Sequence, residues 1–99
     1  MAASPLTDGA RLLAWARRAA GELERKRGEI NELNVFPVPD ADTGSNMADT
    51  MRAAVQEASA LPEGAAVTEV AEALAVGAVR GARGNSGVVL SQVMRGLAQ

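Results

Sequence analysis

Two aspartates, Asp40 and Asp42, are separated by a single residue in a stretch that Pro37 and Pro39 stiffen. Prolines restrict the unbound loop, so side chains carried there lose less entropy when they bind a ligand. At about 4 Å and an effective dielectric constant of 20, two carboxylates repel each other by about 4 kcal/mol, and a divalent cation reverses that sign. By itself an Asp-x-Asp pair is more typical of caps for a helix, here one that begins near Thr43, but the whole run together with the glycine-rich run described below favours a divalent metal site.

The metal in such a site would be held by oxygen alone, because the chain contains no His and no Cys. Oxygen ligands favour Mg²⁺, Mn²⁺ or Ca²⁺ over transition metals that prefer nitrogen or sulfur. A calcium-binding EF-hand loop needs Gly at its sixth position and Glu at its twelfth. Counted from Asp40, those positions hold Ser45 and Met51, so an EF-hand is disfavoured.

A second run, Gly81–Gly87, has glycine at every third position and opens an apolar stretch. Glycines at Gly84 and Gly87 would let the backbone approach an anion closely. If a helix starts near Ser86, the N–H groups of Ser86, Gly87 and Val88 are expected to be unpaired, at the positive end of the helix dipole. By itself the pattern fits phosphate binding and close packing between alanine-rich helices equally, and its occurrence together with the Asp-x-Asp run favours phosphate binding.

The phosphate prediction does not rest on a known nucleotide motif of the Walker A type, because no Lys-Ser or Lys-Thr pair follows the glycines. Arg83 can reach a phosphate or pair with an acidic residue on the surface. A site for divalent cations together with a site for phosphate indicates a metal–nucleotide centre.

The composition limits the remaining choices. Ninety-nine residues suffice for one domain, and a net charge of −2 argues against a general nucleic-acid binder. The hydrophobic share is 47%, but with one Trp, one Phe and no Tyr it implies helices packed closely over small residues. No apolar stretch reaches about 18 residues and no secretion signal is visible, so a cytoplasmic protein is expected.

The hydrophobic spacing predicts an all-α fold of antiparallel, up-and-down helices. The first helix should begin at Thr7 or Asp8 and weaken at Gly28, with one further turn over 29–33. The second should run from Thr43 or Ser45 to about residue 60. The third should be capped by Thr68, and the fourth should start near Ser86, although residues 88–90 could also form a buried strand. The expected apolar stripes of the last three helices are Met47, Met51, Ala54, Val55 and Ala58; Val70, Ala73, Leu74 and Gly77; and Val88, Val89, Val93, Met94 and Leu97.

The runs Leu33–Met47 and Gly81–Gln92 closely resemble the paired motifs of the DAK2-type, or DhaL-like, ATP-binding domain. That domain occurs in dihydroxyacetone kinases and in the ATP-binding subunit of bacterial fatty acid kinases. The sequences Asn-Val-Phe-Pro-Val-Pro-Asp and Gly-Ala-Arg-Gly-Asn-Ser-Gly-Val resemble the fatty acid kinase branch. The resemblance extends over Leu12–Gly96, with Ala41 where the family usually has Gly and Ser45 where Thr is commoner.

The resemblance implies a fold and a set of site residues. Residues 1–99 would be the first half of an eight-helix barrel, truncated on its C-terminal side, with Mg²⁺ and ATP bound at one end. Asn34 is similar to a third aspartate of the dihydroxyacetone kinase branch, and a helix C-cap is its equal alternative. The implied metal ligands are Asp40, Asp42 and Asn34, and the implied nucleotide-binding residues are Thr43, Ser45, Asn46, Gly84, Asn85, Ser86 and Gly87.

The implied activity is ATP-dependent phosphate transfer to a fatty acid carboxylate that a separate acyl-binding, DegV-like protein presents. One alternative is dihydroxyacetone (glycerone) kinase activity, which relies on a His from another subunit or domain. The other is a non-catalytic interaction or regulatory module that retains the nucleotide motif. These 99 residues alone are expected to be inactive, and to expose the stripes Met47/Met51/Val55 and Val89/Val93/Leu97 or cover them in a homodimer.

Overall fold

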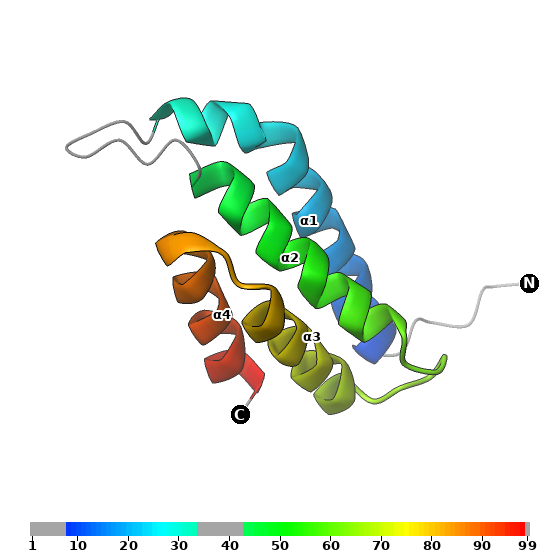
Figure 1. Cartoon of the computed structure of the whole chain (residues 1–99). Helices are drawn as coiled ribbons and strands as arrows, with labels where there is room; N and C mark the ends of the chain where they lie inside the picture. Colours follow the sequence, from blue (N-terminus) through cyan, green and yellow to red (C-terminus); the bar gives the residue numbers. More distant parts are fainter. Residues whose placement is uncertain (1–7, 34–42, 99) are drawn as a thin grey trace, which may run out of the picture.

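The computed structural model describes residues 8–33 and 43–98, and these residues form four α-helices and no β-strand. The all-α prediction is confirmed, and the alternative of a strand over 88–90 is wrong because those residues are helical. Helices that are consecutive in the chain run in opposite directions (Figure 1). In chain order the elements are α1 (Asp8–Leu33), α2 (Thr43–Ser59), α3 (Val67–Gly81) and α4 (Gly84–Ala98).

The second helix is the centre of the arrangement. It packs against each of the other three, whereas α1 and α4 do not pack against each other. As Figure 1 shows, α2 and α4 begin at the same end of the molecule, where α1 ends. The fold therefore brings the first turns of the two helices that follow the candidate motifs to one end.

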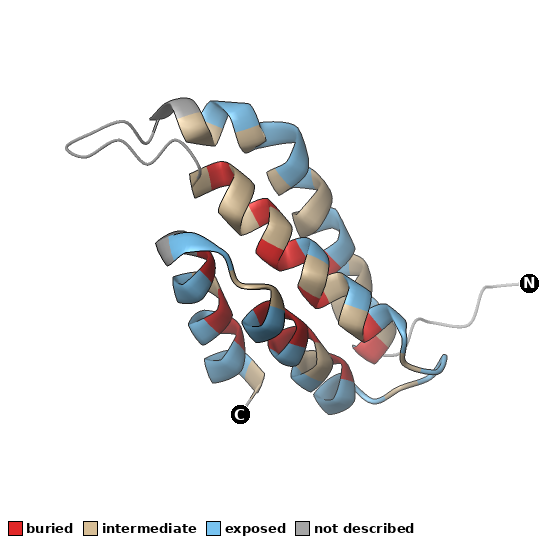
Figure 2. Ribbon diagram, in the orientation of Figure 1, coloured by how far each residue is buried: buried red, intermediate tan, exposed pale blue. Residues whose placement is uncertain are grey.

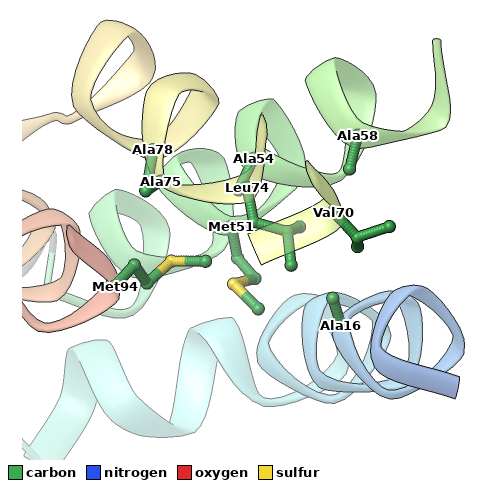
Figure 3. Close-up of a cluster of buried hydrophobic side chains, with 9 residues drawn as sticks. All are labelled: Ala16, Met51, Ala54, Ala58, Val70, Leu74, Ala75, Ala78 and Met94. Atoms are coloured by element: carbon green, nitrogen blue, oxygen red, sulfur yellow. The ribbon is translucent and has the colours of Figure 1, made fainter. Parts of the chain in front are cut away.

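Small side chains form most of the core, as the composition predicted. Ala16, Ala54 and Ala78 are 0% exposed, and the larger Met51 and Leu74 are each 3% exposed. Figure 3 shows these residues gathered between the helices, together with the remaining members Ala58, Val70, Ala75 and Met94. Alanine methyl groups let helix backbones approach closely, so the core depends on shape fit more than on bulk. No helix in the described part of the chain is long and apolar enough to cross a membrane.

Three helix boundaries differ from the prediction. The first helix continues through Gly28 to Leu33 without a break, because packing against α2 and α3 outweighs the weak helix propensity of one glycine. The third helix begins at Val67, so Thr68 lies inside it. At the start of this helix, the Oε1 atom of Glu69 accepts a hydrogen bond from the Ala66 N–H at 3.0 Å. The fourth helix begins at Gly84, two residues before the expected start.

The buried face of α4 also differs from the predicted apolar stripe. Ser91 and Met94 are 2% and 9% exposed, whereas Val89 is 62% and Leu97 is 76% exposed. The outer side of α4 therefore carries apolar residues that are open to solvent, and Figure 2 colours this side of the ribbon pale blue, for exposed residues. The expectation of an exposed Val89/Val93/Leu97 stripe is confirmed. The same expectation for Met47/Met51/Val55 is wrong for Met51, which lies in the core.

The small-residue core predicts a sharp contrast between two adjacent positions of α3. Ala78 is 0% exposed and Val79 is 43% exposed. Ala78→Leu should lower the free energy of unfolding by about 1–3 kcal/mol, because the larger side chain pushes α3 away from α2. Val79→Leu, the matched control, should change it by less than about 0.5 kcal/mol. Urea titration of both variants measures the difference, and equal effects would show that the core tolerates bulk.

Candidate functional site

The residues predicted to bind metal fall outside the part of the chain that the structure describes. Asn34, Asp40 and Asp42 all lie within 34–42, so their role as ligands stays a prediction. Within residues 8–33 and 43–98, no group of three His, Cys, Asp or Glu side chains could hold a metal ion. The described half of the candidate site therefore consists of the first turns of α2 and α4 and the side chains that fix them.

The first turn of α2 is held by Asn31, which lies in the last turn of α1. The side-chain oxygen of Asn31 accepts hydrogen bonds from the N–H of Gly44 at 2.7 Å and from the N–H of Ser45 at 3.2 Å. Its Nδ2 atom donates to Ser45 Oγ at 3.1 Å. Asn31 thus serves as the N-terminal cap of a helix that starts 12 residues later in the chain.

Sequence reasoning missed Asn31, although it stands three residues before the predicted ligand Asn34. Its only signal is a polar side chain on the face of α1 that turns toward α2. The contact has a chemical consequence, because two backbone donors at the start of α2 are already engaged within the protein. Ser45 is consequently oriented by Asn31, with its hydroxyl serving as an acceptor.

The first turn of α4 is joined to α2 through Thr50, which is 0% exposed. Its hydroxyl donates to the carbonyl oxygen of Asn46 in the preceding turn of α2, at 2.7 Å. Thr50 Oγ1 also accepts a hydrogen bond, at 3.3 Å, from the backbone N–H of Arg83, the residue just before α4. One hydroxyl therefore connects the two motif-bearing segments, 33 residues apart.

Two glycines allow α4 to approach α2 this closely. Gly84 has a φ of 63°, a left-handed conformation that favours glycine, and a Cβ there would collide with the side-chain amide of Asn46. A Cβ at Gly87 would lie 2.5 Å from Thr50 Oγ1. The packing alternative considered for these glycines is thus realised, and Asn46 from the first motif lies against Gly84 from the second.

The backbone donors at the start of α4 differ from the predicted set. The N–H of Gly87 donates to the carbonyl of Arg83 at 3.1 Å, so it is not unpaired as predicted. Because the helix begins at Gly84, its first-turn N–H groups are those of Gly84, Asn85 and Ser86. The expected donors Gly87 and Val88 lie too far along the helix. A phosphate at this end would meet a set of amides shifted by two residues.

Arginine side chains lie beside this end of the molecule. Arg27 bridges Glu24 at 2.7 Å and Asp49 at 3.2 Å, which ties α1 to α2. The hydrogen bond to Glu24 is the main influence that raises the pKa of the Arg27 guanidinium above its ordinary value, so Arg27 stays charged. An open polar groove of about 360 Å³ nearby is lined in part by Asp49, Arg52 and Arg83. Arg52 pairs with Asp49 at 2.7 Å.

Comparison with known proteins identifies the family. Residues 37–99 match the DAK2 domain, which is more than half of the chain, and the chain therefore belongs to the DAK2 domain family. This result confirms the DhaL-like family indicated by the two motifs, a family of nucleotide-binding modules. Assignment to the fatty acid kinase branch stays a prediction.

Several longer bacterial proteins are similar to this chain. It is 39% identical over 92 residues to Protein YloV of Bacillus subtilis (strain 168), covering 93% of this chain and 16% of that protein. An uncharacterized protein of Staphylococcus saprophyticus is 38% identical over 92 residues, with the same coverages. An uncharacterized protein of Staphylococcus aureus (strain USA300) is 41% identical over 80 residues, covering 80% of this chain and 14% of that protein. The chain thus spans about one sixth of the length of these curated relatives.

The cap formed by Asn31 predicts the effect of two substitutions. Asn31→Ala removes the acceptor for two backbone donors and should lower the free energy of unfolding by about 0.5–2 kcal/mol. Asn31→Asp retains an acceptor, with a charge that the helix dipole favours, and should be milder. Glu29→Ala, at an exposed position of the same helix, is the control. Thermal unfolding followed by circular dichroism checks the order, which is refuted if Asp and Ala are equally damaging.

Proposed function

We propose that this chain is the Mg-ATP-binding part of a kinase. The observation that carries the proposal is the meeting of the two motifs, with Asn46 of the first packed against Gly84 of the second. Asp40 and Asp42 precede α2 directly in sequence. The two carboxylates of the first motif and the first-turn amides of α4 thus belong to motifs whose described residues Asn46 and Gly84 are in contact. Membership of the DAK2 domain family supports the same reading.

In this proposal Asp40, Asp42 and Asn34 hold Mg²⁺. Their ligand atoms are carboxylate and amide oxygens, which suit a hard cation, and the chain has no His or Cys to compete. The bound Mg²⁺ would neutralise phosphate charge during transfer. The backbone amides of Gly84 and Asn85 would bind a phosphate oxygen.

The hydroxyl and amide side chains that follow complete the nucleotide site. Thr43, Ser45 and Asn46 belong to the first turn of α2, and Ser86 is two residues past the start of α4. In this proposal their polar groups contact the nucleotide. Gly87 contributes by letting α4 approach α2. Such a site acts through positioning and charge neutralisation, which requires neither a covalent intermediate nor a titrating base on this chain.

For the phosphate acceptor we propose a fatty acid carboxylate presented by a separate acyl-binding protein of the DegV-like kind. The support is the amino-acid sequence of the two motifs, which resembles that of the fatty acid kinase branch. Acceptor recognition would lie outside these residues. A direct assay supplies this chain's full-length natural protein with ATP, the acyl-binding partner and a fatty acid, and follows acyl phosphate. Transfer to dihydroxyacetone instead would contradict the assignment.

The metal proposal predicts that ATP affinity depends on the two aspartates. Replacing both Asp40 and Asp42 with Ala should weaken Mg-ATP binding by about 10²-fold or more, because the metal bridge to the phosphates is lost. The double variant Glu63→Ala/Glu72→Ala removes two exposed carboxylates elsewhere and should bind normally. Calorimetric titration with and without EDTA provides the measurement. Unchanged affinity in the aspartate variant, or unchanged affinity in EDTA, would refute the metal site.

We further propose that the four helices are the first half of an eight-helix barrel. Between α1 and α4 lies an apolar groove of about 360 Å³, lined by Leu12, Trp15, Met51, Leu74, Val93 and Leu97, among others. Trp15 and Val93 are each 53% exposed. In this proposal the open apolar groove is a contact surface. Further helices of the same domain would fill it.

The groove proposal predicts a change at the single tryptophan of the chain. In a longer protein with further helices of the domain, the fluorescence of Trp15 should shift to shorter wavelength and resist quenching by acrylamide. The longer protein should also have a higher Tm and bind ATP more tightly. Leu97→Asp should reverse these gains in the longer form, because a charge would enter an apolar contact. Gln92→Asp, at an exposed position of α4, is the control. The proposal fails if the 99 residues alone form a stable monomer with the kinase activity of the longer form.

A further inference from the structure

Two residues with buried hydroxyl groups occur among the described residues, and both hydroxyls bond within their own helix. Thr50 is 0% and Ser91 is 2% exposed. Each donates to a carbonyl of its own helix at 2.7 Å, Thr50 to Asn46 and Ser91 to Val88. Thr50 Oγ1 alone also accepts a bond from another element, the N–H of Arg83. The helix-internal bond is common for Ser and Thr, so the second bond is the feature that needs explanation.

The bond from Arg83 lies at the point where the chain turns from α3 into α4. Arg83 is followed by Gly84 with a φ of 63°, and the carbonyl of Arg83 accepts the first bond of α4, from Gly87. The Thr50 hydroxyl therefore holds Arg83, the residue that immediately precedes α4. Gly87 packs against the Thr50 hydroxyl so closely that a Cβ would not fit. The position of the first turn of α4 relative to α2 is therefore fixed both by this contact and by the hydrogen bond.

The Thr50 hydroxyl also donates a hydrogen bond within α2, and its acceptor is equally informative. The carbonyl that accepts the Thr50 proton belongs to Asn46, whose side chain lies against Gly84. A single hydroxyl thus links the backbone of the first motif to the backbone of the second. A valine at this position would keep the shape but break both bonds, and would leave the Arg83 N–H without its acceptor.

We propose that Thr50 is a positioning residue, whose hydroxyl sets the register between the start of α2 and the phosphate-binding start of α4. The proposal rests on the function proposed above, in which the first-turn amides of α4 bind a phosphate. Thr50 itself touches no nucleotide. Its contribution is to keep those amides at a fixed distance from the first turn of α2, which follows Asp42 in the sequence, so both halves of the proposed site can act on one Mg-ATP.

The test compares hydroxyl deletions at the two buried positions, in the natural full-length protein. Thr50→Val should weaken Mg-ATP binding roughly tenfold, about the worth of one hydrogen bond. Binding of adenosine, which lacks phosphates, should change less than twofold. Ser91→Ala, the matched control, should leave both unchanged, and Thr50→Ser should restore ATP affinity. Amide hydrogen exchange at Arg83 should accelerate in Thr50→Val and not in Ser91→Ala.

The outcomes separate the positioning role from the function beneath it. If the wild type binds no nucleotide, the proposed function fails and the role of Thr50 fails with it. If the wild type binds Mg-ATP and Thr50→Val binds it equally well, only the positioning role is overturned. An equal loss for ATP and adenosine, or a loss matched by Ser91→Ala, also overturns it, since that pattern reports general unfolding. Should Thr50→Val not fold, Thr50→Ala is measured instead, with binding normalised to the folded fraction.

Discussion

The close approach of other helices to α2 is the constraint on which the rest of the structure depends. The buried face of α2 consists mainly of small residues, and Ala54 is 0% and Ala58 is 1% exposed. Each alanine buries little apolar area, so stability comes from many close contacts that all require the same helix spacing. Because α2 contacts every other helix, that spacing is set for the whole molecule at once. The first turn of α2 then lies at a fixed place relative to α4.

The same close spacing lets short polar side chains act between helices. Thr50 reaches the Arg83 backbone, and Asn31 reaches the first turn of α2, each with a side chain of few rotatable bonds. Short side chains lose little conformational entropy on being fixed, so these links hold the helices at low cost. A long side chain such as that of Arg27 also crosses to α2, at Asp49, but on the more exposed side. The site end is thus ordered by small groups rather than by a large core.

Sequence periodicity predicted the helices but not what covers them. The pattern in α4 singled out its large residues, such as Val89 and Leu97, yet the helix is buried along Gly87, Ser91 and Met94. A hydrophobic stripe shows which face prefers to be buried, and it does not show which neighbour is present. Asn31 was missed for a related reason, because a cap that comes from another helix leaves no local signal. The Gly84–Gly87 spacing did carry information, because both glycines lie where α4 begins and packs closely against α2.

Helix ends of both polarities meet at the end of the molecule where α2 and α4 begin. The positive ends of the α2 and α4 dipoles lie there beside the negative ends of α1 and α3, so the helix dipoles offset one another and local groups decide the potential. Asn31 satisfies two α2 donors with a neutral amide, so this cap adds no negative charge at that end. An aspartate in its place would add one. The arrangement therefore satisfies these backbone donors of α2 within the protein, whereas the function proposed above assigns the first-turn amides of α4 to a phosphate.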